Sequence, residues 1–317
     1  MLNFLCKRLI YAVILVIFIS FFTFTLMKIT GDPLADLKLN PSISQEKINA
    51  ETKRLGLDKP VHLQYLSWLI NLGKGDLGLS QNNQRVIDVI KPALLNTLLL
   101  NIVALFFTWL IAVLFGVLTA VFKDSWLDSF INLVNSILMS SPSFLIAIFM
   151  LIIALYSGCL PIGGLTSSNF DELNIVEKFF DIAKHLILPV VILVLLGFTS
   201  VQKQMQANLL DVLNASYIRT AKAKGLSYPV IIIKHALRNA INPLITMFGF
   251  EFAGLFAGSG IIEMIISYPG LGHLTLEAAR KLDVNLVLAN LLLGSMMLVL
   301  GNLLADLLLY KLDPRSK

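Results

Sequence analysis

Long runs almost free of charged residues dominate the pattern of hydrophobic and polar positions along the chain. A bilayer core of about 30 Å needs about 20 consecutive apolar residues in a helix. The runs that approach or exceed this length are 9–27, 93–122, 129–156, 185–203, 241–262 and 284–310. Pro189 lies near the start of the fourth run, where a helix tolerates proline. The pattern predicts an all-α integral membrane protein with six transmembrane helices.

The composition supports this prediction, because 56% of the 317 residues are hydrophobic, 14% are charged and the mean hydropathy is +0.79. A typical globular chain carries about 25% charged residues, so too few polar side chains are present to cover a soluble domain. The formal net charge is +5, but the basic residues are not gathered on one soluble face. We therefore expect the lipid bilayer, and no nucleic acid, as a partner.

The first run also invites the interpretation of a signal peptide, because Lys7 and Arg8 precede it. The run is longer than the usual apolar core of about 7–15 residues, and no A-x-A-like cleavage site follows it. We therefore expect an uncleaved anchor.

Basic residues gather on one side of the predicted spans, and this asymmetry indicates the orientation of the chain. With the N-terminus in the cytoplasm, that side contains Lys7, Arg8, Lys123, Lys203, Arg219, Lys222, Lys224, Lys234, Arg238, Lys311, Arg315 and Lys317. The loop between the third and fourth spans is acidic instead. The sequence predicts a multi-pass protein of the cell (inner, cytoplasmic) membrane with both termini in the cytoplasm.

A polar segment between the first two spans predicts a small extracytoplasmic helical module. Ser42–Gln45 fits a capping box, and Gly56 stands where a glycine ends a helix. A second helix after Pro60 carries an apolar stripe, whose members are Leu63, Leu66, Leu69 and Ile70. We expect this stripe to pack on the membrane domain, and a docking face for a partner is the alternative. The expected domains are 1–92, with the first span and this module, and 93–312.

Residues 204–240 are polar and basic but keep a helical pattern of apolar positions. Gly225 and Pro229 interrupt that pattern, which predicts two helical legs joined by a short Ala-rich helix from Tyr217 to Lys224. Gly225 can adopt a positive φ that ends this helix, and small alanines allow another surface to approach closely. The alternative is a solvated loop that only satisfies the excess of positive charge in the cytoplasm.

The segment YIRTAKAKGLSYPVIIIKHALRNAINPLIT, residues 217–246, resembles the cytoplasmic loop of ABC-transporter permeases of the dipeptide, oligopeptide and nickel class. The wider family motif has the form E-A-A-x-x-x-G followed by I-x-L-P. Arg219, Thr220 and Ala221 occupy the E-A-A positions and Gly225 the glycine, while Arg238 stands in the region of the family's proline. The two arginines resemble the B-type subunit. Other pieces that resemble this subgroup are TGDPLADL, LGLDKPVHLQYLSWL, GDLGLS, SPSF, YPGLGHLTLEAA and LDPRSK.

The resemblance implies a type-I ABC permease fold over residues 93–312, with a coupling helix that sits in a cleft of an ATP-binding subunit. The residues assigned to ATPase coupling in this way are Tyr217, Arg219, Thr220, Ala221, Ala223, Lys224, Gly225, Leu226, His235, Arg238 and Asn239. The implied partners are a C-type sister permease, two ATP-binding subunits and an extracytoplasmic solute-binding protein. The implied function is half of a translocation pore for di- and oligopeptides, with nickel or a metal chelate as the alternative substrate.

An enzyme is not expected, because the four histidines are isolated from one another and none has the H-E-x-x-H spacing of a metalloprotease. The glycine-rich residues 254–260 lack the Lys-Ser/Thr ending of a P-loop, so we expect no ATP site in this chain, and the resemblance implies that ATP hydrolysis takes place on partner subunits. We expect no cofactor and no metal. An ion-coupled secondary transporter is the alternative from another class, although it should show inverted repeats and several buried ionisable groups.

Glu251 lies near the middle of the fifth predicted span, where a carboxylate is costly in the bilayer. Such a residue should face a pore, water or another protein group rather than lipid. Glu251 is therefore a candidate pore-lining residue. The alternative is a hydrogen bond that holds two helices together.

Overall fold

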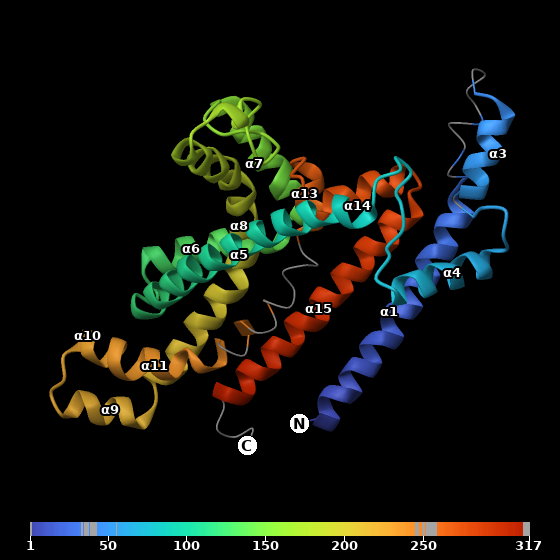
Figure 1. The fold of residues 1–317 in the computed structure, drawn as a ribbon. Coiled ribbons are helices and arrows are strands. Elements are labelled where there is room, and N and C mark those ends of the chain that lie inside the picture. Colours follow the sequence, from blue (N-terminus) through green and yellow to red (C-terminus); the bar gives the residue numbers. More distant parts are fainter. Residues whose placement is uncertain are drawn as a thin grey trace. The chain divides into compact units, whose positions relative to one another are not determined.

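The computed structural model of the protein describes residues 2–32, 34, 38, 43–54, 56–244, 247–248, 251 and 259–312. Helices make up the secondary structure of these ranges, apart from one isolated antiparallel bridge between Leu79 and Arg85 (Figure 1). The prediction of an all-α protein is confirmed for the described part of the chain.

Two compact units divide the chain. One consists of Met1–Asn96 and Gly270–Val299, and the other of Thr97–Pro269 and Leu300–Lys317. Helices α5 (Val86–Val121) and α15 (Val284–Leu312) contribute residues to both units. Helix α5 begins before the expected residue 93 and contains Pro92 in its interior. The domain boundary between residues 92 and 93 stays a prediction.

The first unit contains α1 (Leu2–Thr30), α3 (Gln45–Arg54), α4 (Val61–Gly73) and α14 (Leu271–Arg280). At the start of α3 the Ser44 hydroxyl accepts a hydrogen bond from the Lys47 backbone N–H at 3.4 Å. At its other end Gly56 has φ +64°, and the Leu57 N–H donates to the Thr52 carbonyl at 2.9 Å, as in a Schellman motif. The predicted glycine stop is confirmed, while Ser42 of the expected capping box lies outside the described residues.

Helix α4 buries two aromatic residues rather than the predicted stripe. Tyr65 and Trp68 are 6% and 7% exposed, and the Tyr65 hydroxyl lies 2.8 Å from Ser20 Oγ of α1. Three members of the stripe are exposed, namely Leu63 at 44%, Leu66 at 50% and Ile70 at 59%. The predicted packing is wrong for these three residues, because aromatic rings bury more area than leucine and take the face toward α1.

The second unit contains α6 (Trp126–Ser140), α7 (Ser143–Ser157), α8 (Ile175–Leu213) and α13 (Gly260–Ile265). Within the described chain, α5 and α8 are long and apolar enough to cross a membrane, and α6 with α7 makes a third span only if the two are counted together. Shorter apolar helices cover Val13–Ile29 and Val284–Met297, which belong to the first and sixth predicted spans. Much of the fifth predicted span, 241–262, lies outside the described residues. Six spans therefore stay a prediction that the structure supports in part.

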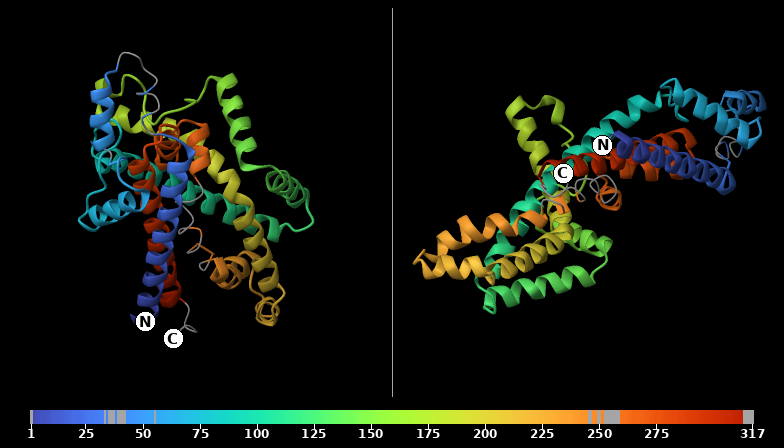
Figure 2. Two further views of the ribbon diagram at one scale, coloured as in Figure 1. Left: turned by 90° about the vertical axis from the view of Figure 1, so that its right-hand side faces the viewer. Right: turned by 90° about the horizontal axis from the view of Figure 1, so that it is seen from below.

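The third predicted span is not one straight helix. Helices α6 and α7 meet at an angle of 111° (Figure 2), and Ser141 between them is extended with φ −95° and ψ 130°. Proline disfavours the helical region for the residue before it and offers no N–H to the preceding turn. Pro142 therefore ends α6 and starts α7, although the hydropathy is continuous from 129 to 156.

Helix α8 has 39 residues and extends well beyond the predicted 185–203. Asn174 and Glu177 form a capping box at its start, with reciprocal bonds of 2.9 and 3.0 Å. Pro189 therefore lies in the helix interior and not in its first turns, so that part of the prediction is wrong. Hydropathy alone missed the polar ends, where amphipathic turns continue the same helix.

Candidate functional site

Residues 214–240 form a helical hairpin that follows α8, called the α9 hairpin below. It consists of α9 (Ser216–Ala223), α10 (Tyr228–Val230), a π-helical segment η2 (Ile231–Ala236) and α11 (Leu237–Ala240). Helix α9 lies beside the returning leg (Figure 1). The short helix predicted from Tyr217 to Lys224 is confirmed to within a residue at each end.

Helix α9 is amphipathic. Ile218 is fully buried and Ala221 is 8% exposed, so both side chains pack inside the hairpin. The exposed residues of α9 and its end are Ser216, Tyr217, Arg219, Thr220, Lys222, Ala223, Lys224, Gly225 and Leu226. Of the two alanines expected to leave room for a partner, only Ala223 is therefore on the surface.

Gly225 ends α9 in a left-handed conformation with φ +78°. The Gly225 N–H donates to the Lys222 carbonyl at 3.0 Å, and the Leu226 N–H donates to the Ala221 carbonyl at 3.4 Å. These two bonds are the Schellman pattern, which satisfies the last carbonyls of a helix. A Cβ atom at Gly225 would meet nothing within 4 Å, so conformation rather than space calls for glycine. The predicted positive φ is confirmed.

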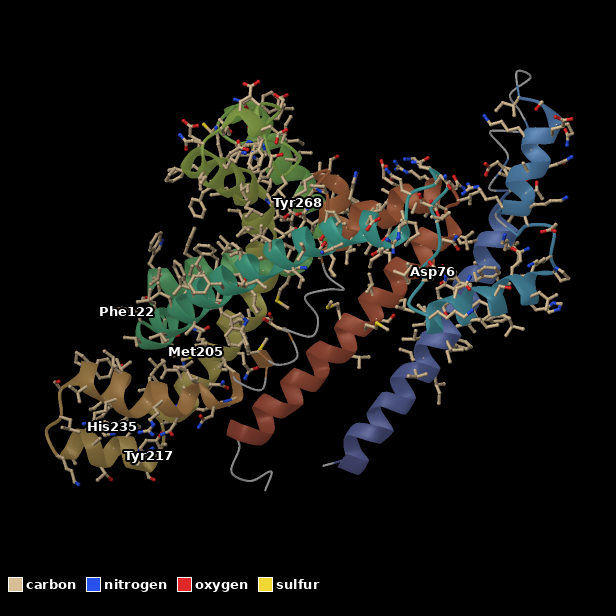
Figure 3. All side chains as sticks on the ribbon, in the orientation of Figure 1. Asp76, Phe122, Met205, Tyr217, His235 and Tyr268 are labelled. Carbon is tan, nitrogen blue, oxygen red and sulfur yellow. The ribbon has the colours of Figure 1, made fainter. Side chains whose placement is uncertain are left out.

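A side-chain hydrogen bond joins α9 to the returning leg of the hairpin, which consists of α10, η2 and α11. The Asn239 Nδ2 group donates to the Tyr217 hydroxyl at 2.9 Å and to the His235 carbonyl at 3.2 Å. His235 is half-buried and Arg238 is exposed. Figure 3 shows Tyr217 on α9, His235 on the returning leg and Met205 on α8. Three residues assigned from the resemblance thus meet at Asn239, which connects Tyr217, 22 residues earlier, to His235 in its own leg.

The surface of the hairpin is basic. Its charged residues are Arg219, Lys222, Lys224, Lys234 and Arg238, and the sequence from 214 to 240 contains no aspartate or glutamate. All five basic residues are exposed. The hairpin therefore presents a cationic surface.

Apolar side chains fix the hairpin to the rest of the second unit. Ile231, Ala236 and Ala240 are at most 1% exposed, and they belong to one core cluster with Met205 and Leu209 of α8. The same cluster includes residues of α5 and α6. The alternative of a solvated loop does not fit this burial, because a solvated loop would leave its apolar residues in water.

Polar side chains also connect α8 to its neighbours. Gln202, fully buried, donates to Thr119 of α5 at 2.8 Å and accepts from Asn135 of α6 at 2.7 Å. One turn later, Gln206 donates to the buried carboxylate of Asp128 at 2.8 Å. Buried polar groups need such partners, so these contacts fix the position of α8 against α5 and α6.

Glu251 makes hydrogen bonds to two helices. One carboxylate oxygen accepts from Trp109 Nε1 of α5 at 2.8 Å, and the other accepts from the Ser200 hydroxyl of α8 at 3.4 Å. The Trp109 ring also contacts Phe248 edge-on, with centroids 5.1 Å apart. The alternative of an interhelical hydrogen bond therefore has a geometric basis, and the pore-lining role stays a prediction.

A second acid, Glu263 of α13, was not singled out from the sequence. It is fully buried, and its Oε1 atom accepts bonds from Thr97 at 2.9 Å and from Ser259 at 3.0 Å. Asn101 donates to Ser259 at 3.0 Å, which extends the cluster along α5. Glu263 follows the last residue of the fifth predicted span, and this position at a span boundary is the signal that could have identified it.

Within the described ranges, no three His, Cys, Asp or Glu side chains gather closely enough to hold a metal ion.

Two family descriptions match the chain. "Binding-protein-dependent transport system inner membrane component" matches residues 112–317, and its N-terminal counterpart matches residues 1–100. The oligopeptide transport system permease protein AppB of Bacillus subtilis is 35% identical over 316 residues, with 98% of each chain covered. The oligopeptide permease protein OppB of Haemophilus influenzae is 34% identical over 321 residues, and the dipeptide permease protein DppB of Alkalihalophilus pseudofirmus is 32% identical over 333 residues; both alignments cover 100% of each chain.

Proposed function

The chain belongs to the family of binding-protein-dependent transport system inner membrane components, and we propose that it is the permease subunit of an ATP-driven importer of di- and oligopeptides. The single observation that carries this proposal is the match over nearly the whole chain to relatives named as oligopeptide and dipeptide permeases. These names favour peptides over nickel or a metal chelate as the substrate. The chain itself is not an enzyme in this proposal, since ATP hydrolysis takes place on partner subunits.

The α9 hairpin is the coupling element. Its exposed basic face, with Ala223 and the tight glycine end at Gly225, suits a helix that sits in a cleft of an ATP-binding subunit. Its apolar residues are buried against α8, so a movement of the hairpin is transmitted to that helix. ATP binding closes two nucleotide-binding subunits, which moves α9 and reorients the pore from inward-facing to outward-facing.

The complete transporter contains a C-type sister permease, two ATP-binding subunits and an extracytoplasmic solute-binding protein. This chain supplies half of the pore and one of the two mechanical links to ATP hydrolysis. Glu251 is the candidate pore-lining acid, where it contacts the cationic end of a peptide during passage. Its bonds to Trp109 and Ser200 hold the carboxylate in place between passages.

Both termini lie in the cytoplasm in this proposal, which the basic residues beside the spans support. In a background without Cys6 and Cys159, single cysteines at Ser44 and Ser168 should react with an impermeant thiol reagent added outside intact cells. A cysteine at Ser216 should react only after permeabilisation. Labelling of position 216 in intact cells would reverse the orientation and exclude α9 from contact with a cytoplasmic ATPase.

Co-purification and uptake test the function directly. The chain should co-purify with an ATP-binding subunit, and proteoliposomes with all subunits should accumulate a labelled oligopeptide only when ATP and the binding protein are present. Uptake by the chain alone, driven by an ion gradient, would establish the secondary transporter instead. ATP-dependent uptake of a nickel chelate without peptide uptake would establish the alternative substrate.

A further inference from the structure

The first unit encloses a cavity that the proposed function does not use. It has a volume of about 320 Å³ and is lined by residues of α1, α3, α4, the loop before α5 and the start of α15. Asp76, labelled in Figure 3, is one of the lining residues and follows α4 in the sequence. A volume of this size is at the lower end of small-ligand sites.

The residues that line the cavity are apolar beside the first predicted span and basic at the end of that span and in the polar module. Phe24 and Trp68, both at least nine-tenths buried, provide the apolar wall, and Phe24 belongs to the first predicted span. Lys28 stands at the end of that span, and Lys53 and Lys59 line the cavity from the polar module that follows. This arrangement suits an amphiphilic ligand whose apolar part contacts the span and whose anionic group contacts the basic residues of the module.

The acidic residues of the lining are already occupied by backbone donors. Asp283 accepts from the Gln81 N–H at 2.8 Å and from the Leu286 N–H at 3.2 Å, and Asp76 accepts from the Gly78 N–H at 2.9 Å. These bonds hold the Asp76 carboxylate within its own loop and hold the Asp283 carboxylate to the loop before α5 and to the first turn of α15.

The basic residues of the lining differ in whether they already have hydrogen-bond or ion-pair partners. Arg54 is held by Glu51 at 2.6 Å and by Asn83 at 3.1 Å. Lys53 and Lys59 make no side-chain hydrogen bond or ion pair to any residue that the structure describes. Two ammonium groups are therefore left to bind an anion.

Trp68 gives a second, independent sign of a ligand. Its side chain is 7% exposed and lines the cavity, yet its indole Nε1–H has no hydrogen-bond partner in the described chain. A buried donor without a partner is costly, so buried polar groups are nearly always satisfied. Tryptophan and lysine are also the residues that membrane proteins place at the level of lipid headgroups.

We propose that this cavity binds the phosphodiester headgroup of an anionic membrane phospholipid. Lys53 and Lys59 bind the phosphate, and the Trp68 indole N–H donates to a phosphate or ester oxygen. The acyl chains run along the apolar surface of α1, where Phe21 is 48% and Ile29 is 75% exposed. The apolar wall favours a lipid over a free phosphate, which has no apolar part to contact it.

Lipid binding by the full-length chain tests this site without any transport assay. The protein, purified in detergent and freed of native lipid, is titrated with phosphatidylglycerol, and bound lipid is counted by native mass spectrometry. The double variant Lys53→Gln/Lys59→Gln should weaken binding about tenfold or more, because two charge-assisted hydrogen bonds are lost. Trp68→Phe keeps the ring but removes the donor, and it should weaken binding severalfold. Lys47→Gln, on an exposed part of α3 outside the cavity, is the matched control and should bind as the unmodified chain does.

Competition distinguishes the possible ligands. Phosphatidylcholine should bind more weakly than phosphatidylglycerol, and neither inorganic phosphate nor a tripeptide with a free carboxylate should displace the lipid. Equal lipid affinity of the Lys53→Gln/Lys59→Gln and Lys47→Gln variants would overturn the site. Displacement by inorganic phosphate would make it a site for soluble phosphate, and displacement by the peptide would make it a substrate site; either result would also refute the proposal.

Discussion

Replacing Gly225 by valine tests whether the end of α9 is a docked mechanical part. The residue has φ +78° and a Cβ atom there would meet nothing within 4 Å. The free-energy cost of a side chain at position 225 therefore comes from the backbone conformation alone, because no neighbouring atom has to move. For a β-branched residue a left-handed conformation costs about 1–3 kcal/mol, while asparagine adopts it more readily.

This cost acts directly on the last turn of α9. The strained residue can be relieved only by giving up the bonds from Gly225 to Lys222 and from Leu226 to Ala221, which fix the helix end. A cost of about 1.4 kcal/mol changes the ratio of capped to frayed ends tenfold. Ala223 and Lys224, which the proposal places in contact with the ATPase, would then be out of position in a large share of molecules.

Uptake and co-purification of the ATPase measure the effect, with membrane levels of the subunit as the reference. We expect normal insertion for all variants, lost uptake and weak co-purification for Gly225→Val, and values close to the unmodified chain for Gly225→Asn. Gly56→Val is the matched control, since Gly56 also ends a helix at φ +64° with open space around its Cβ position. It should carry a similar backbone cost and leave co-purification intact. Wild-type uptake by Gly225→Val, or equal losses in the Gly56 and Gly225 variants, would refute a specific docking role for the α9 end.

Three further variants test the polar contacts of the second unit. Glu251→Leu leaves the Trp109 indole N–H without its acceptor and should destabilise the purified protein by about 1–3 kcal/mol, measured as a lower melting temperature. Glu251→Gln keeps an acceptor, so a loss of uptake in this variant with assembly intact would show that the charge itself is required. Unimpaired uptake by both variants would leave the pore-lining role without support. Glu263→Ala removes the acceptor of two buried hydroxyl bonds and should also lower the melting temperature, with a cost of about 1–3 kcal/mol; an unchanged value would mean that the cluster is not structural. The Asp181 carboxylate accepts from the Ser167 hydroxyl at 2.5 Å and from the Ser167 N–H at 2.8 Å, which tethers the loop before α8; Asp181→Asn should weaken this tether and speed hydrogen exchange of the loop 158–172 at pH 7, and unchanged exchange would contradict the tether.

Local signals in the sequence predicted the α9 hairpin well. The end of α9 depends on a glycine at C′ and on two backbone bonds within six residues, and such a motif is readable without knowledge of the fold. The same holds for Gly56 at the end of α3. The long apolar helices were also predictable, because the width of a bilayer fixes how many apolar residues are needed.

Other features depend on information that hydropathy does not contain. The 111° bend between α6 and α7 arises from the backbone limits of Ser141 before Pro142, and no charged residue interrupts the sequence from 129 to 156 to mark it. The exposed stripe on α4 could not be separated from its buried aromatic face, since both have helical spacing. Trp109, which donates to Glu251, and Thr97, which donates to Glu263, lie more than 140 residues away in the sequence, and no pattern within one segment reports such contacts.

The attachment of the α9 hairpin to α8 distinguishes a mechanical part from a basic loop. A loop that only had to place positive charge in the cytoplasm would need no buried residues, yet Ile218, Ile231 and Ala236 are at most 1% exposed. Exposing one such isoleucine costs about 1.5–3 kcal/mol, and several would be exposed together if α9 moved without α8. Helix α8 continues unbroken from Ile175 to Leu213, so the displacement passes to a segment that is fixed against α5 and α6 by the contacts of Gln202. A partner that moves α9 must therefore either carry α8, together with the parts of α5 and α6 bound to it, or expose the buried residues of the hairpin.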